Sequence, residues 1–150
     1  KLNDMPGHEG YYLFLSHRDG NAYQASGYYT DPNTNKRYLF DGPYGEARTT
    51  GWFDTTGVPY QEDRKVYFKK DGSMAQGVTN IDGDIYLFTQ SRRRDYNWYK
   101  SFGWYSDTRT GYRYYFDRGN GGKAVRGQEK VIDGKRYKFN DQGALTMTYL

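Results

Sequence analysis

The chain repeats one short pattern of apolar and polar positions. An aromatic residue, or valine in one copy, stands two positions before a phenylalanine, and a polar turn follows. Residues two apart lie on the same face of a β-strand, so each copy predicts a strand with two large side chains on one face. The copies occupy residues 12–14, 38–40, 66–68, 86–88, 114–116 and 137–139. Such recurrence predicts a repeat protein.

Asp-Gly pairs divide the β-rich runs. Asp82-Gly83 lies between residues 78–81 and 85–88, and Asp133-Gly134 lies between residues 130–132 and 136–139. Asp-Gly favours the type I′ turn, in which both central residues need a positive φ. These pairs therefore predict two-stranded hairpins.

The spacing of the pattern predicts the domain organisation. Trp104 follows Trp52 by 52 residues and Gly127 follows Gly77 by 50 residues. We predict one domain over residues 1–150, in which three-stranded units alternate with two-stranded units. The end of a preceding unit, residues 1–26, is followed by units at 27–50, 51–76, 77–102, 103–126 and 127–150. The fold class is all-β, a β-solenoid-like array of stacked two- and three-stranded hairpins, since no segment has helical apolar periodicity.

The composition explains how such an array could bury a core. Val, Ile, Leu and Phe make up 23 of the 150 residues, a fraction typical of disordered chains. However, 18 Tyr, 8 Phe and 3 Trp provide a large apolar area, and a net charge of +4 is too small to keep the chain open. There is no cysteine, which excludes disulfides and thiolate metal sites.

The same residues argue against several functions. His8 and His17 are too few and too separated for a metal site or a triad. Five of the 18 carboxylates belong to Asp-Gly pairs, where Asp is suited to the backbone geometry of a turn. We therefore expect no catalytic residue, metal or cofactor. No apolar run is long enough to span a membrane, and the start of the chain does not resemble a signal peptide, so we expect a monomeric part of a longer chain.

A basic cluster leaves one further alternative. Arg92, Arg93 and Arg94 stand near Tyr96 and Trp98, a combination compatible with nucleic-acid binding. Acidic residues are interspersed with the basic ones along the chain, which favours a solvated loop. We do not expect a nucleic-acid partner.

The order of these motifs resembles a known family. Gly, a variable segment, Ile-Asp-Gly, Tyr-x-Phe and Asp-Gly resemble the YG-type glucan-binding and cell-wall-binding repeats of secreted Gram-positive proteins. The resemblance is closest to the glucan-binding domains of glucansucrases of the dextransucrase type, and it extends from about Gly27 onward. It implies a secreted or cell-surface location and a polysaccharide partner.

The resemblance also implies a sugar site. In the family, Gln-x-Lys on one strand faces Tyr-x-Phe on the next, which Gln128-Glu129-Lys130 and Tyr137-Lys138-Phe139 match. The earlier hairpin departs from this pattern, with Val78-Thr79-Asn80 before Tyr86.

A pyranose needs an aromatic platform for its CH face and polar groups for its hydroxyls. Gln128 donates and accepts hydrogen bonds, Lys130 donates three, and Tyr137 or a neighbouring tyrosine supplies the platform. The candidate carbohydrate-binding residues are Gln128, Lys130, Tyr137, Tyr114, Tyr115 and Tyr86.

The predicted function is binding of extracellular, dextran-like α-glucan by a non-catalytic module that tethers an attached enzyme or the cell surface to polymer. The alternative is a wall-anchoring module for choline, teichoic acid or another wall glycan. Each aromatic residue also has a purely structural interpretation. We expect the phenylalanines to form the core, and Trp52 and Trp104, which follow glycines, to pack between units.

Overall fold

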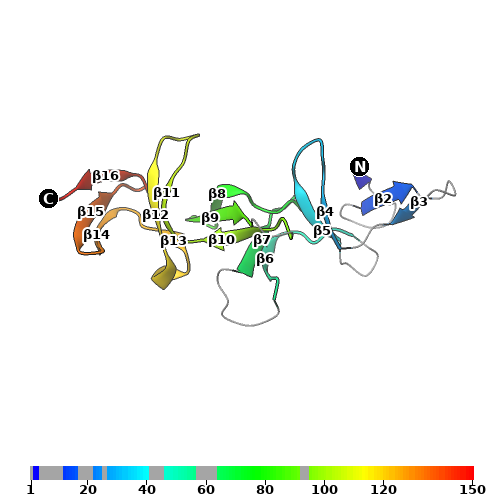
Figure 1. Cartoon of the computed structure of the whole chain (residues 1–150), viewed down its shortest axis with the longest axis horizontal. Helices are drawn as coiled ribbons and strands as arrows, with labels where there is room; N and C mark the ends of the chain where they lie inside the picture. The colour runs from blue at the N-terminus through cyan, green and yellow to red at the C-terminus, as the bar shows by residue number, and fades with distance from the viewer. Residues whose placement is uncertain are drawn as a thin grey trace. The chain divides into compact units, whose positions relative to one another are not determined.

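The computed structural model describes residues 27–40, 46–56, 64–91 and 95–150, and the backbone of residues 2–3, 12–16 and 22–24. The described part is built from short antiparallel strands, and no described segment is an α-helix (Figure 1). The predicted all-β array of two- and three-stranded hairpins is confirmed. The chain divides into two compact units, one of Lys1–Thr55 with Val66–Ala75 and one of Thr56–Lys65 with Gln76–Leu150.

Three small sheets are described in the first unit. Strands β1 (Leu2–Asn3), β2 (Tyr12–Ser16) and β3 (Ala22–Gln24) form a three-stranded sheet. Two-stranded sheets follow, the first from β4 (Gly27–Thr30) and β5 (Arg37–Phe40), the second from β6 (Gly51–Asp54) and β7 (Lys65–Phe68).

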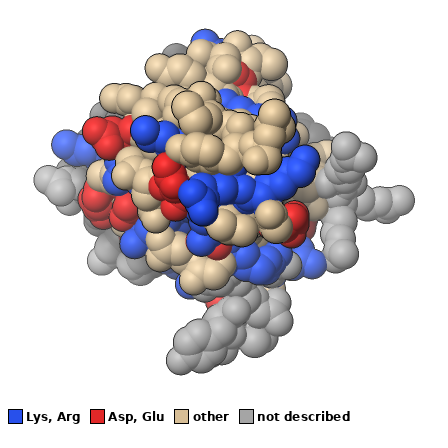
Figure 2. Space-filling view, turned by 90° about the vertical axis from the view of Figure 1, so that its left-hand side faces the viewer, with Lys and Arg blue, Asp and Glu red and all other residues tan. Residues whose placement is uncertain are grey.

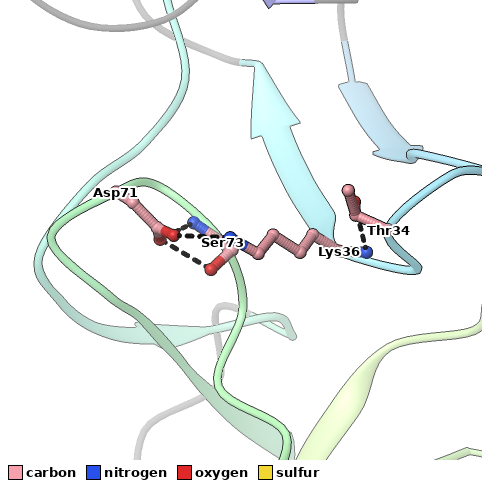
Figure 3. Close-up of polar contacts among 4 residues, drawn as sticks. All are labelled: Thr34, Lys36, Asp71 and Ser73. Atoms are coloured by element: carbon pink, nitrogen blue, oxygen red, sulfur yellow. Dashed lines mark hydrogen bonds and ion pairs between the residues drawn. The ribbon is translucent and has the colours of Figure 1, made fainter.

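The predicted third strands of these two sheets are reduced to single bridges. Phe40 bridges Ala47, and Phe68 bridges Met74. A hydrogen-bonded turn connects Phe68 to Met74: Asp71 accepts hydrogen bonds from Ser73 N at 2.8 Å and Ser73 Oγ at 2.6 Å, and Lys36 Nζ lies 3.2 Å from its other oxygen (Figure 3). The carboxylate thus stabilises the turn through the backbone and side chain of Ser73.

The described residues of the second unit form three sheets of three strands each. The first consists of β8 (Gly77–Ile81), β9 (Asp84–Gln90) and β10 (Trp98–Ser101). The second consists of β11 (Gly103–Ser106), β12 (Arg113–Asp117) and β13 (Lys123–Ala124), with the 3₁₀ turn η2 (Arg118–Asn120) between the last two strands. The third consists of β14 (Gln128–Ile132), β15 (Lys135–Phe139) and β16 (Leu145–Thr148).

The strand counts of the first and third sheets differ from the sequence prediction. Both were predicted to be two-stranded, but β9 extends to Gln90 and pairs with β10, which begins at Trp98, soon after the basic cluster at residues 92–94. Likewise, β15 pairs with β16 after a register shift between Lys138 and Phe139. A third strand gives each hairpin the additional pairing that a lone hairpin lacks.

The two Ile-Asp-Gly turns have the predicted geometry. Asp82 and Gly83 have φ of 52° and 88°, and Asp133 and Gly134 have φ of 50° and 83°. Two consecutive positive φ values define the type I′ turn. The predicted turns at Asp19-Gly20 and Asp41-Gly42 lie outside the described residues.

The core is formed by the phenylalanine of each described copy. Five phenylalanines are at most 1% exposed: Phe40, Phe68, Phe88, Phe116 and Phe139. In the second unit, Phe116 packs with Tyr114, Leu87 and Ala124, while Phe139 packs with Val125 and Ile132. The prediction of phenylalanine as the core residue is confirmed for these five copies. The side chain of Phe14 lies outside the described residues.

Candidate functional site

Three of the predicted site residues share one face of the last sheet. Lys130 on β14 lies directly opposite Tyr137 on β15, and Gln128 lies opposite Phe139. Opposite residues in an antiparallel pair, and residues two apart along a strand, point to the same side. Gln128 is exposed, whereas Lys130 and Tyr137 are half-buried. A donor and an aromatic ring are therefore neighbours at the edge of the core.

Trp104 joins this face to the preceding sheet. Its ring centroid lies 4.8 Å from that of Tyr137 at 68°, and 5.1 Å from that of Tyr115 at 64°. Trp104 and Tyr115 are direct partners in the β11–β12 pair. These three half-buried side chains, Trp104, Tyr115 and Tyr137, are called the Trp104 cluster below. Edge-to-face contacts of this kind are favourable and leave parts of the ring faces at the surface.

Phe139 is the buried residue against which the cluster packs. It lies 5.9 Å from Trp104 at 30°, and Trp104, Tyr115 and Tyr137 all pack against the core residues around it. The predicted packing of Trp104 between hairpins is therefore observed. Its place beside Tyr137 was not predicted, because the sequence does not show which residues of successive hairpins meet.

A carboxylate completes the polar edge of the site. Lys130 Nζ lies 3.2 Å from Asp117 Oδ2, and Asp117 Oδ1 accepts a hydrogen bond from Gly119 N at 3.0 Å. The backbone contact holds the carboxylate, and the ion pair holds the ammonium near the cluster. Sequence reasoning missed Asp117, although its place directly after Tyr114-Tyr115-Phe116 was visible.

An arginine covers part of Trp104. The Arg113 guanidinium carbon lies 4.8 Å from the Trp104 ring centroid, and Arg113 Nη1 donates to Ser106 Oγ at 3.2 Å. A guanidinium over an indole face is an attractive cation–π contact. The cluster thus combines aromatic faces, hydrogen-bond donors and one carboxylate.

The structure places Tyr114 and Tyr86 in the core. Tyr114 is 3% exposed and contacts Phe116 and Tyr112, at centroid distances of 5.5 and 6.1 Å. Tyr86 is 8% exposed. Tyr114 shares a strand face with Phe116, and its neighbour Tyr115 points the other way. A pyranose has no open ring face at either buried residue, so we leave Tyr114 and Tyr86 out of the site.

The register corrects the comparison of the two hairpins. Gly77 lies opposite Phe88 and Thr79 opposite Tyr86, so Gly77 and Thr79 occupy the places of Gln128 and Lys130. The motif comparison in the sequence predicts Val78 and Asn80 at these places, which is one residue out of register with the observed pairing. The Thr79 hydroxyl donates to the carbonyl of Gly77 at 3.3 Å. The β8–β9 hairpin lacks the amide and the ammonium.

A related aromatic pair lies in the described part of the first unit. Trp52 and Tyr67 have centroids 5.3 Å apart at 70°, close to the values for Trp104 and Tyr115. Trp52 is 39% exposed. The same strand positions thus present a tryptophan and a tyrosine in both units.

Three further observations concern the described part of the chain. In Figure 2, acidic side chains lie among the basic ones on the face shown. Among the described residues, no group of His, Cys, Asp or Glu side chains could hold a metal ion. The described part also contains no helix with the length and apolarity of a membrane span.

Comparison with known proteins identifies similar folds. Neither the models of known protein families nor the curated proteins include a match. The structure is similar to that of choline binding protein F from Streptococcus pneumoniae, determined in the presence of a peptidoglycan analogue, with a TM-score of 0.56 and 22% identity. The match covers 93% of this chain and 41% of that chain.

Two further structures give context. Choline binding protein F in complex with ipratropium matches with a TM-score of 0.55 and 16% identity, over 93% of this chain and 43% of that chain. Alternansucrase in complex with isomaltotriose matches with a TM-score of 0.38 and 22% identity, over 89% of this chain and 10% of that chain. A score of 0.38 supports no argument about this chain. The similarity to choline binding protein F places the chain in the class of hairpin-repeat folds, and the chain spans about two fifths of that structure.

Proposed function

We propose that this chain is a non-catalytic module that binds α-glucan at the Trp104 cluster and its polar edge. The observation that carries the proposal is the direct pairing of Lys130 with Tyr137, with Trp104 packed 4.8 Å from the Tyr137 ring. The module tethers an attached enzyme or the cell surface to extracellular polymer.

The residues at this site match the two sides of a pyranose. The apolar CH face of the sugar packs against the accessible part of an aromatic ring, and its hydroxyls lie in the ring plane. Lys130 donates to these hydroxyls, Gln128 both donates and accepts, and Asp117 accepts. Binding of this kind transfers no proton and breaks no bond.

Binding strength comes from repetition along the polymer. A half-covered aromatic cluster with a few polar groups gives a weak single site, but a long glucan offers the same unit many times. The Trp52–Tyr67 pair is a second aromatic surface on the same chain. Engagement of two surfaces by one polymer raises the overall affinity without any new contact.

A wall-anchoring module is the second candidate. The fold similarity to choline binding protein F favours it, and aromatic rings bind quaternary ammonium groups. The contact between Arg113 and Trp104 favours the neutral glucan, because one cation already lies on that ring. We therefore place α-glucan first.

Native gel electrophoresis in gels that contain dextran tests the proposal. Dextran should retard the wild-type chain relative to a non-binding protein, and added salt should change the effect little because the ligand is neutral. Gln128→Ala should weaken binding about two- to tenfold, the value of one hydrogen bond. Gln142→Ala is the matched control, since Gln142 is exposed in the turn after β15 and lies outside the proposed site.

The outcomes separate the candidates. Retardation by choline-bearing wall polymer but not by dextran would support the wall-anchoring module. If Gln128→Ala lost its folded structure together with binding, Gln128 would be structural and the site would lie elsewhere. Equal binding by Gln128→Ala and Gln142→Ala would also remove Gln128 from the site.

A further inference from the structure

The position of Arg113 follows from the register of β11 and β12. Arg113 lies opposite Ser106, and Trp104 lies opposite Tyr115, so all four side chains point to one face. Arg113 Nη1 donates to Ser106 Oγ at 3.2 Å, and the guanidinium carbon lies 4.8 Å from the Trp104 ring centroid. The hydroxyl thus holds the guanidinium over the ring.

The same arrangement occurs once more in the described residues, 76 positions earlier in the chain. Arg37 lies 4.9 Å from the Tyr28 ring centroid and donates to Thr30 Oγ1 at 2.9 Å. The turns that connect the strands also agree: Asp31 N donates to Lys36 O at 2.8 Å, as Asp107 N does to Tyr112 O at 2.9 Å. In both copies an arginine lies over an aromatic ring and donates a hydrogen bond to a hydroxyl of the paired strand. The contact therefore recurs with a different ring and a different hydroxyl.

The two copies differ in what surrounds the ring. Tyr28 has Leu39 as its cross-strand partner, and Arg37 is 8% exposed. Trp104 has Tyr115 as its partner and Tyr137 as a further neighbour, and Arg113 is exposed. Of these two described arginines, Arg113 is the exposed one, and it lies beside a cluster of three aromatic rings.

We propose that Arg113 determines the ligand specificity of the Trp104 cluster by acting as a resident cation. Its guanidinium occupies the ring face that would attract a quaternary ammonium group, and its positive charge repels a second cation. Arginine has five N–H donors in a planar fork, so the same side chain can donate to hydroxyls of a neutral sugar. This inference rests on the proposed function, because it assigns a ligand class to the same site.

Choline chloride and isomaltotriose, a short soluble dextran fragment, are suitable probes for the intact chain. The chain has three tryptophans, so an ¹H–¹⁵N spectrum gives three indole signals, and Trp104→Phe identifies the signal of Trp104. Wild type and Arg113→Ala are titrated with each probe. Arg118→Ala is the matched control, because the Arg118 guanidinium lies 4.1 Å from the Phe102 ring, outside the cluster.

Arg113→Ala should gain choline binding. We expect the Trp104 signal of this variant to shift saturably with choline, with an affinity about tenfold above that of wild type, the size of a partly desolvated cation–π contact. Isomaltotriose should bind Arg113→Ala several-fold more weakly than wild type. Arg118→Ala should behave as wild type with both probes, and Arg113→Lys, which keeps the charge, should not gain choline binding.

Equal choline affinity in wild type and Arg113→Ala, or no choline binding by either, would overturn the inference. Choline titration and dextran retardation are separate measurements. The glucan proposal is refuted by the absence of retardation, and the Arg113 inference is refuted by the choline titration. If Arg113→Ala lost its dispersed spectrum, Arg113→Gln would replace it, since it removes the charge and keeps a donor for Ser106. The same gain is expected, and its absence counts against the inference.

Discussion

Gly143, in the turn between β15 and β16, provides a sharp test of how the last two sheets pack. Its φ is 86°, and a Cβ added there would lie 3.0 Å from Tyr114 Cδ1 and 3.2 Å from Tyr114 Cε1. Tyr114 is 3% exposed and packs against Phe116, so its ring has little room to move. Gly134 is the matched control, with a φ of 83° and nothing within 4 Å of an added Cβ.

The expected losses differ because only one position adds a clash. A left-handed conformation costs an L-residue about 1–2 kcal/mol, and both variants incur this cost. Overpacking against a buried side chain costs a further ~1–3 kcal/mol, which applies to Gly143→Ala alone. We expect a decrease in unfolding free energy of about 1–2 kcal/mol for Gly134→Ala and about 2–5 kcal/mol for Gly143→Ala.

Urea unfolding followed by tryptophan fluorescence measures both changes. The midpoint should fall for both variants, and further for Gly143→Ala, with the slope against urea unchanged. Equal losses at the two positions, or a greater loss for Gly134→Ala, would show that Tyr114 does not close the space at Gly143. The packing of β12 against the last turn would then be wrong.

Three further predictions concern charge and burial. Burial raises the pKa of Asp71, but hydrogen bonds from Ser73 and Lys36 outweigh it and leave the pKa below its ordinary value. The stability that the Asp71 carboxylate contributes is present above the unfolded-state pKa of about 3.9 and is lost as pH falls through the folded-state pKa. Urea unfolding between about pH 6 and pH 2 should therefore show a steeper loss of unfolding free energy in wild type than in Asp71→Asn. Lys130→Met should change the unfolding free energy by less than about 1 kcal/mol, because the ion pair of Lys130 with Asp117 is partly exposed. The same variant should weaken dextran retardation, and unchanged retardation would exclude Lys130 from the site. Phe139→Ala should lose about 3–5 kcal/mol in urea unfolding, and a loss below about 1 kcal/mol would contradict its place in the core.

Periodicity predicted the parts of the fold that depend on local chemistry. The described phenylalanines of the repeat are core residues, and both described Ile-Asp-Gly turns have the two positive φ values that type I′ requires. Strand β10 was not predicted, and residues 144–150 were open to two interpretations, a frayed end or a terminal strand, of which the structure has the strand β16. The formation of both strands depends on where the neighbouring strand ends: β9 runs on to Gln90, and β15 shifts register at Phe139 to pair with β16.

Part of the proposed site follows from the sequence pattern, and the same periodicity explains why Tyr114 and Tyr86 lie in the core. Tyr114 stands two positions from Phe116, so the rule that makes the phenylalanine a core residue also directs the tyrosine inward. Tyr115, between them, points to the other face and meets Trp104. The contacts of Asp117 with Lys130 and of Arg113 with Trp104 join residues whose meeting depends on hairpin packing and register.

The hairpins therefore share one core while differing in the groups they present. Gly77 and Thr79 stand where the last hairpin has Gln128 and Lys130. Thr79→Lys would restore the ammonium, but Gly77 has a φ of 74°, and an added Cβ there would lie 3.6 Å from Arg109 Nη2. A glutamine at position 77 would be strained whatever the space around it, since this φ is unfavourable for L-residues. The positive φ at the start of β8 therefore disfavours a glutamine in that hairpin. The hairpin of β14 and β15 carries both donors, the amide of Gln128 and the ammonium of Lys130.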